Sequence, residues 1–253
     1  MKYGIRQYIF VIRELTAREI KRKYARSVLG IVWSVLNPLL FMIVIGIVFS
    51  GYSLYPEKYP VYFITGRTLW ILFSTATMTS LTAFEDNKSL FIKAKVKRET
   101  FILSRNYTAL VNLWFSCIAL LIVYICVGVK INWTIIIIII DVFLELLFSI
   151  GISFILATSY VFYKDIKNIW NHLIFIIAHM VAVFVPIERY PKNLHQITQM
   201  NPLYIYPNIA RQCVLYGTFN KKELFIAIIW AVVTFILGII YFKIRENEIV
   251  KKI

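Results

Sequence analysis

The stretch REIKRKYARSVLGIVWSVLNPLL, residues 18–40, changes character partway along its length. Five of its first nine residues are basic, and the rest is largely apolar up to an Asn-Pro pair. A basic collar at the start of an apolar run is typical of a helix that enters a membrane from the cytoplasm. We therefore expect an integral membrane protein. The collar residues are Arg18, Lys21, Arg22, Lys23 and Arg26.

The whole chain has the composition of such a protein. Of its 253 residues 60% are hydrophobic, its mean hydropathy is +0.72, and the apolar residues gather in long runs. A spanning helix needs about 20 residues. The predicted fold is a single all-α domain, 1–253, with six spans, an N-terminal interfacial helix and short re-entrant or interfacial helices before the last span. The predicted spans are 28–49, 59–81, 107–129, 134–158, 169–185 and 223–242.

The position of the positive charge predicts the orientation of the chain. With both termini in the cytoplasm, 20 of the 28 Lys and Arg residues lie in inner segments and seven in outer ones, with Arg67 left within a span. Inner loops of membrane proteins carry this excess. A basic face that meets anionic lipid accounts for most of the net charge of +15, so we expect membrane lipids and no nucleic acid as partners.

Two features flank the start of the first span. Residues 5–24 alternate apolar and basic positions at helical spacing, which predicts an amphipathic helix on the inner membrane surface within a cytoplasmic segment 1–27. A plain anchor is an equally simple reading. Pro38 removes a helix hydrogen bond and disfavours helical geometry at Asn37, so we expect a bend or an interruption there, with a structural kink as the simplest role.

Two loops are organised rather than simple turns. In the inner loop 83–105, Glu85 and Asp86 precede an apolar group bracketed by basic residues, which suits a short helix presented to a cytoplasmic partner. A basic loop that only faces lipid is the alternative. In the outer segment 186–222, KNLHQITQM and NIARQCVLYG each follow a proline, and both pieces are too short to span a membrane.

Ionisable residues inside spans are candidates for function because they are costly there. Arg67 and Asp141 are expected at similar depth, and we predict that Arg67 pairs with Asp141 or with Glu145 one turn deeper; snorkelling of Arg67 to outer head groups is the alternative. Aromatic and His side chains at helical spacing could contact a polar cargo, although such aromatics are common in spans. His172 and His179 lack a third ligand, so no metal site is expected. The path candidates are Phe63, Arg67, Trp70, Asp141, Glu145, His172, Phe175 and His179.

Several stretches, in order, resemble the permease subunits of type 2 ABC exporters that move bacterial O-antigen, capsule or teichoic acid. They are LTAREIKRKYARSVLGIVWSVLNPLLFMIVIGIVFS, GRTLWILFS, NKSLFIKAKVKRETF, YVFYKDIKNIW, VPIERYP and NPLYIYPNIAR. Lys97 stands where the family often has proline, and Lys164 replaces the usual Arg before Asp165. Structural roles are expected for Asn37, Pro38, Asp165, Pro186, Asn201 and Pro202.

The resemblance implies a homodimer in the bacterial plasma membrane that works with a separate ATPase, which would use the ATP and Mg²⁺. It implies that the collar contacts the head group of a lipid-linked glycan at the cytoplasmic entrance. It also implies a coupling helix at Glu85–Arg98. The coupling candidates are Glu85, Asp86, Lys88, Phe91, Lys93, Lys95 and Arg98.

Nothing in the sequence suggests that this chain itself hydrolyses ATP, since it has no GxxxxGK[ST] loop, and we expect it to bind no cofactor and to be no enzyme. A drug or small lipid is an alternative cargo, although exporters of that kind usually carry a larger outer domain. A membrane enzyme acting on lipid-linked sugars is a further alternative; Asp141 and Glu145 share a helix face, but no third catalytic group accompanies them.

Overall fold

The computed structural model describes residues 4–25, 29–30, 32–49, 58–93, 96–130 and 132–252, and every regular element in these ranges is helical. The predicted all-helical fold is therefore confirmed for the described residues. The elements are α1 (Ile5–Tyr24), α2 (Val32–Phe49), α3 (Tyr59–Leu81), α4 (Ala83–Asp86), α5 (Lys88–Lys93), α6 (Glu99–Val127), α7 (Ile135–Phe162), α8 (Ile166–Met180), the 3-10 turn η3 (Ile187–Arg189), α9 (Lys192–Met200), α10 (Pro202–Tyr216) and α11 (Lys221–Lys252).

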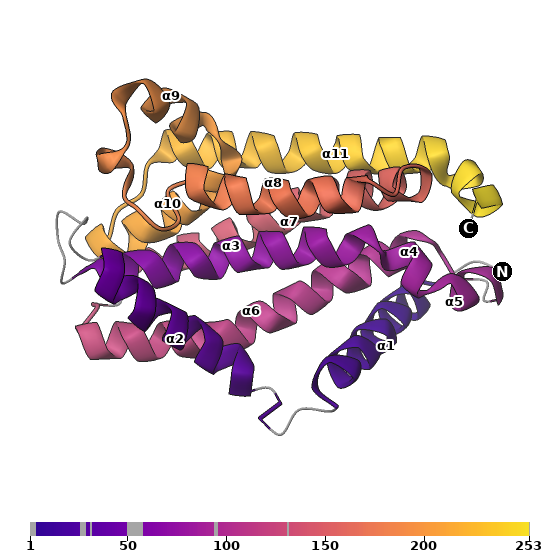
Figure 1. Ribbon diagram of the computed structural model, residues 1–253, viewed down its shortest axis with the longest axis horizontal. Coiled ribbons are helices and arrows are strands. Elements are labelled where there is room, and N and C mark those ends of the chain that lie inside the picture. Colours follow the sequence, from indigo (N-terminus) through magenta and orange to yellow (C-terminus); the bar gives the residue numbers. More distant parts are fainter. Residues whose placement is uncertain are drawn as a thin grey trace.

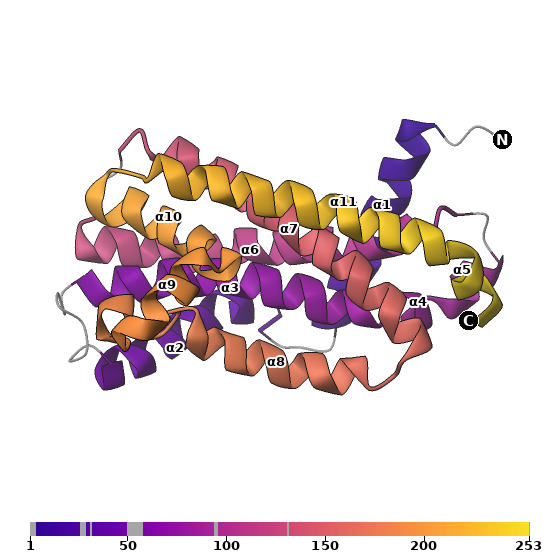
Figure 2. The same cartoon turned by 90° about the horizontal axis from the view of Figure 1, so that it is seen from above.

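The long helices run side by side in one bundle (Figure 1). Helix α3 packs against α6 and α7, and α7 packs along α11. Seen from above, α4, α5 and both ends of the chain lie at one end of the bundle, whereas α9 and α10 lie at the other (Figure 2). The first and last helices, α1 and α11, therefore have their chain ends at the same end of the bundle.

Three helices of the described chain are long and apolar enough to cross a membrane by length and composition: α6, α7 and α11. Helix α8 is shorter than the predicted span 169–185, because it ends at Met180 and the backbone turns at Ala182, where φ is +51°. Helix α6 begins at Glu99, eight residues before the predicted start at 107. Hydropathy located the apolar part of α6 and missed its polar first turns.

Helices α7 and α11 approach each other through glycines. A Cβ atom at Gly238 would lie 2.3 Å from the carbonyl oxygen of Gly151, and a Cβ at Gly151 would lie 2.4 Å from the carbonyl oxygen of Thr234. Membrane helices pack closely where small residues let their backbones meet. The side-by-side packing of α7 and α11 therefore depends on the absence of side chains at these two positions.

Helix α2 continues through Pro38, so the predicted possibility of an interruption is wrong. Pro38 lies only two turns into the helix and is buried, whereas Asn37 is exposed. Asn37 lines a cavity that also borders α3, described below.

At the opposite end of the bundle, the predicted piece 192–200 is α9, with Pro191 directly before it. The second piece begins earlier than predicted, because α10 starts at Pro202 and contains Pro207. The side chain of Asn201 accepts a hydrogen bond from the Leu203 amide at 3.0 Å and so caps this helix. The structural role predicted for Asn201 and Pro202 is thus the start of α10.

Candidate functional site

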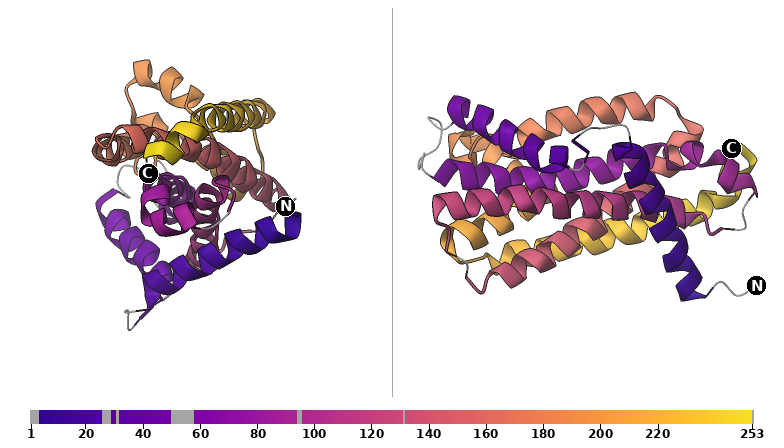
Figure 3. Two further views of the ribbon diagram at one scale, coloured as in Figure 1. Left: turned by 90° about the vertical axis from the view of Figure 1, so that its right-hand side faces the viewer. Right: turned by 90° about the horizontal axis from the view of Figure 1, so that it is seen from below.

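Helix α1 confirms the helix predicted at residues 5–24. It lies across the bundle rather than along it (Figure 3). Its inner face packs on α6 and buries Leu15 in a cluster that includes Phe84 and Phe101. Ile5 and Phe10 on the outer face are 80% and 59% exposed. This division of apolar residues is the one expected of a helix held between a protein surface and a lipid surface.

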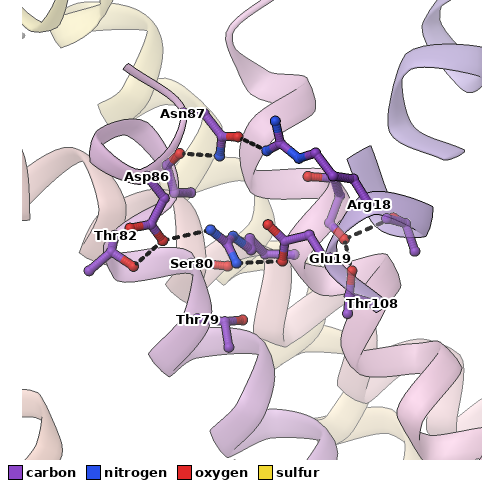
Figure 4. Close-up of polar contacts among 12 residues, drawn as sticks. Arg18, Glu19, Thr79, Ser80, Thr82, Asp86, Asn87 and Thr108 are labelled. Carbon is purple, nitrogen blue, oxygen red and sulfur yellow. Dashed lines mark hydrogen bonds and ion pairs between the residues drawn. The ribbon is translucent and has the colours of Figure 1, made fainter. Parts of the chain in front are cut away.

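A network of charged side chains ties α1 to the inner loop (Figure 4). The Arg105 guanidinium on α6 pairs with Glu19 of α1 and, at 2.6 Å, with Asp86 of α4. Beside this pair, Arg18 of α1 donates to the side chain of Asn87. Burial raises the pKa of Glu19, and the guanidinium groups of Arg105 and Arg18 oppose that effect. One arginine therefore joins the entrance helix to the loop predicted to contact a partner.

The inner loop itself forms two short helices, α4 and α5, instead of one helix over 85–98. Phe91 is half-buried and packs against Phe84 and Phe101, with ring centroids 5.6 and 5.9 Å apart, so part of its ring is taken up by the core. Glu85 pairs with Lys164, whereas Lys88 is exposed.

Of the remaining coupling candidates in the loop, the structure describes the side chain of Arg98 but not those of Lys93 and Lys95. Arg98 pairs with Glu246 of α11 at 3.1 Å. Lys93 lies at the end of α5, but its side chain is outside the described residues, as is Lys95. The exposed surface of the described loop is therefore polar and centres on Glu85 and Lys88.

Two adjoining cavities lie between α1, α3 and α6; α4 contributes to the inner one and α2 to the deeper one. The inner cavity, about 470 Å³, is lined by Glu19, Arg22, Lys23, Thr75, Thr79, Asp86, Arg105, Thr108 and Asn112. The deeper cavity, about 310 Å³, is lined by Lys23, Tyr24, Trp33, Ser34, Asn37, Pro38, Arg67, Ile71, Thr75, Asn112 and Ser116. Lys23, Thr75 and Asn112 line both. The two cavities thus form a path, lined in part by basic side chains, from the Arg105 network to Arg67.

The collar residues are distributed along this path. Lys23 donates to Asn112 at 3.2 Å between the two cavities, and Arg22 lines the inner one. Arg18 is held by Asn87, and Lys21 is exposed and lines neither cavity. Arg26 lies outside the described residues. Sequence reasoning therefore found the basic edge of the path but not which collar residues face it.

The predicted ion pair between Arg67 and Asp141 is wrong. Both carboxylate oxygens of Asp141 are buried without a hydrogen-bond partner, and no ion pair joins Arg67 to Asp141 or Glu145 in the described chain. The Arg67 guanidinium instead lies 3.8 Å over the ring of Phe41 and faces the deeper cavity. Asp141 and Glu145 lie buried on α7 near Tyr206 of α10. Arg67 and Asp141 were predicted at similar depth, but their side chains do not face each other.

The aromatic and His candidates do not converge on the cavities. Phe63 is fully buried between Tyr59 and Phe184, and Trp70 packs on Phe73. His172, Phe175 and His179 are all exposed along α8, and the His179 ring lies tilted against the rings of Phe175 and Phe184. No group of three metal-ligating side chains occurs in the described ranges.

Asp165 and Pro186 begin elements. Asp165 precedes α8 and is exposed, and its backbone carbonyl accepts from the Ile169 amide at 3.0 Å. Pro186 precedes η3, where its carbonyl accepts from the Arg189 amide. Neither residue lines a cavity described above, and their structural roles stay predictions.

Arg211 lies in the predicted outer segment 186–222 and was not among the predicted site residues. Arg211 is 2% exposed and donates to three backbone carbonyls: Tyr62 and Ala182, both at 3.0 Å, and Val183 at 3.2 Å. A Cβ atom at Gly66 would lie 2.0 Å from its guanidinium, so only glycine admits the side chain. Arg211 joins α10 to α3 and to the end of α8.

We expect the replacement Arg211→Lys to destabilise the protein by about 1–3 kcal/mol, because an ammonium group cannot present the planar fork that reaches three carbonyls. Thermal unfolding in detergent measures the loss. Arg245→Lys is the matched control, since Arg245 is exposed and pairs only with Glu248 among described carboxylates. Equal melting temperatures for the two variants would contradict the role given to Arg211.

Comparison with known proteins gives consistent matches. The family model described as ABC-2 type transporter matches residues 11–215. The O-antigen export system permease protein RfbA of Klebsiella pneumoniae is 27% identical over 262 residues, which cover 98% of each chain. The polysialic acid transport protein KpsM of Escherichia coli is 22% identical and covers 93% of each chain. The capsule polysaccharide export inner-membrane protein CtrC of Neisseria meningitidis serogroup B is 22% identical, over 76% of this chain and 74% of its own.

Proposed function

Because the chain belongs to the ABC-2 type transporter family, we propose that it is the permease subunit of an ATP-driven exporter of a cell-envelope polysaccharide. Relatives that export O-antigen or capsule polysaccharide match it over most of their length. The observation that carries the proposal is the basic path between α1, α3 and α6, which starts at the loop end of the bundle and reaches Arg67 within α3. Such a path suits a polar, anionic cargo.

The proposal includes a topology. Helices α2, α3, α6, α7, α8 and α11 would be the six spans, and both termini would lie in the cytoplasm of a bacterial inner membrane. Helix α1 would lie on the inner surface and α9 and α10 at the outer one. The excess of Lys and Arg in the inner segments supports this orientation.

The proposal also includes partners. A separate ATPase subunit would use ATP and Mg²⁺ and dock on the polar surface around Glu85 and Lys88, and a second copy of the chain would complete the exporter. The cargo would be lipid-linked, and teichoic acid is a further polymer of suitable charge. This chain itself would bind no cofactor.

Reconstitution with the candidate ATPase tests the function. In liposomes that contain both subunits and a fluorescent lipid-linked glycan, we expect ATP-dependent appearance of the glycan on the far leaflet. The double replacement of Glu85 and Lys88 by Ala should lower both ATPase retention and export at least tenfold, because it removes exposed charge from the docking surface without opening the core.

Lys222→Ala is the control, since Lys222 is an exposed residue at the opposite end of the bundle. It should retain the ATPase and export normally. Failure of the intact chain to retain any ATPase would remove the energy source and contradict the proposed function.

A further inference from the structure

Helix α7 carries two carboxyl groups inside the bundle. Asp141 and Glu145 are 0% and 1% exposed, and they lie one helical turn apart on the same face. Asp141 follows the first residue of α7 by six positions, about 9 Å along the axis. Helix α7 is long and apolar enough to cross a membrane. Ionisable side chains inside such a helix are costly, which makes the pair a candidate for function.

Three oxygen atoms of this pair are buried without a hydrogen-bond partner: both carboxylate oxygens of Asp141 and Oε2 of Glu145. The hydroxyl groups of the same region donate elsewhere, because those of Thr134, Ser149 and Tyr206 all donate to backbone carbonyls. A buried carboxylate loses its hydration, and without donors it gains nothing in exchange. These oxygen atoms therefore need a positively charged partner that the described side chains do not supply.

The helices around α7 bring no counter-charge to the pair. Helices α3, α4, α6, α8, α10 and α11 pack against α7. On α10 the titratable groups near the pair are Tyr206 and Cys213, and the cation Arg211 donates to backbone carbonyls instead. Arg67 of α3 faces the deeper cavity, and α11 has no charged side chain from Leu224 to Phe242. The charged residues of α4 and α6 lie at the loop end of the bundle, and the basic ones of α8 are exposed.

We propose that Asp141 and Glu145 bind a small cation, a proton or a sodium ion, where α7 meets α10. Either ion answers the same need, because each places positive charge against the buried carboxylate oxygens. Two like charges one turn apart repel each other, which favours binding of positive charge at the pair. Neither residue lines a cavity of the path to Arg67, so this site goes beyond the proposed function and does not rest on it. Loss of the cation leaves unpaired charge where α10 packs on α7.

The thermal stability of the purified chain, in detergent and without any ATPase, tests the site. The variants are Asp141→Asn and Glu145→Gln, singly and together, because an amide has the shape of a carboxyl group and needs no cation. The unfolded chain releases a carboxyl proton above about pH 5. While the fold still holds the proton, each further pH unit should lower the melting temperature of the unmodified chain by about 3–5 °C.

A bound sodium ion predicts a different dependence. Each tenfold increase in sodium concentration, exchanged against choline at constant ionic strength, should raise the melting temperature of the unmodified chain by about 3–5 °C. The double variant should lack both the pH dependence and the sodium dependence. Glu248→Gln is the matched control, since Glu248 is exposed at the loop end and its loss should leave both dependences unchanged.

Infrared spectra separate the two ions. A carbonyl stretch of a protonated carboxyl group that disappears in Asp141→Asn or Glu145→Gln indicates the proton. Absence of that band together with a sodium-dependent melting temperature indicates the sodium ion. The inference is overturned if the unmodified chain and the double variant respond equally to pH and to sodium, and if neither single variant loses a carboxyl band. If the double variant does not fold, each single variant decides by the same comparison.

Discussion

Gly238→Leu is expected to separate α7 from α11 and to destabilise the protein by about 3 kcal/mol or more. The first atom of the new side chain would already lie 2.3 Å from the backbone oxygen of Gly151. No rotamer relieves this contact, because it involves Cβ and a main-chain atom. The α7–α11 contact is the most extensive between any two helices described, so a separation at its middle affects much of the bundle. The expected result is a lower melting temperature in detergent and little protein in the membrane.

Gly46→Leu is the matched control for this experiment. Gly46 also lies in an apolar helix, α2, but a Cβ atom there would meet nothing within 4 Å. The two variants change hydropathy and helix propensity equally and differ only in the space available. If the two variants have the same melting temperature, the close approach of α7 and α11 does not contribute to stability.

The helices could be predicted from the sequence, because hydropathy and the residues that start or end a helix are local properties. Residues 5–24 and 192–200 are the helices that were expected, one from amphipathic spacing and the other from the preceding proline. The errors concern helix boundaries, at the start of α10 and at the end of α8. Asn201 caps α10, which begins at Pro202 and so six residues before the predicted piece. Helix α8 ends at Met180, and the backbone turns two residues later, at Ala182, where φ is positive.

The site was predictable only in part, because the rotation of each helix about its axis decides which side chains face each other in the bundle. Depth along a helix can be counted from the sequence, and it correctly set Arg67 within the second apolar helix. Rotation cannot be counted in this way. Rotation turned Arg67 toward the cavity that Lys23 and Asn37 also line, left the Asp141 carboxylate without a partner, and buried Arg211 among carbonyls.

Arg105 connects the inner loop, where the ATPase would dock, to helix α1 at the entrance of the path. Asp86 belongs to the loop that would receive the ATPase, Glu19 belongs to α1, and Arg105 holds both. The same three side chains line the inner cavity. A movement of α4 would therefore be transmitted through one guanidinium to α1 and to the mouth of the path.

Arg105→Ala should accordingly lower export more than tenfold while leaving ATPase retention unchanged, because Glu85 and Lys88 keep their places. It should also destabilise the protein by about 1–3 kcal/mol, since Glu19, 13% exposed, loses its cation beside Asp86. The exposed pair Arg245–Glu248 provides the control: Arg245→Ala should cost about 0–1 kcal/mol.

A second replacement separates stability from transmission. In Arg105→Ala combined with Glu19→Gln, no unpaired carboxylate remains at position 19, and burial no longer penalises a charge there, so most of the lost stability should return. The link between α4 and α1 stays cut, so export should stay low. Melting temperature and glycan transport, measured on the same liposomes, give the two readings. Full export by this double variant would mean that Arg105 only balances charge, and that α1 responds to the ATPase through its packing on Phe84 and Phe101 instead.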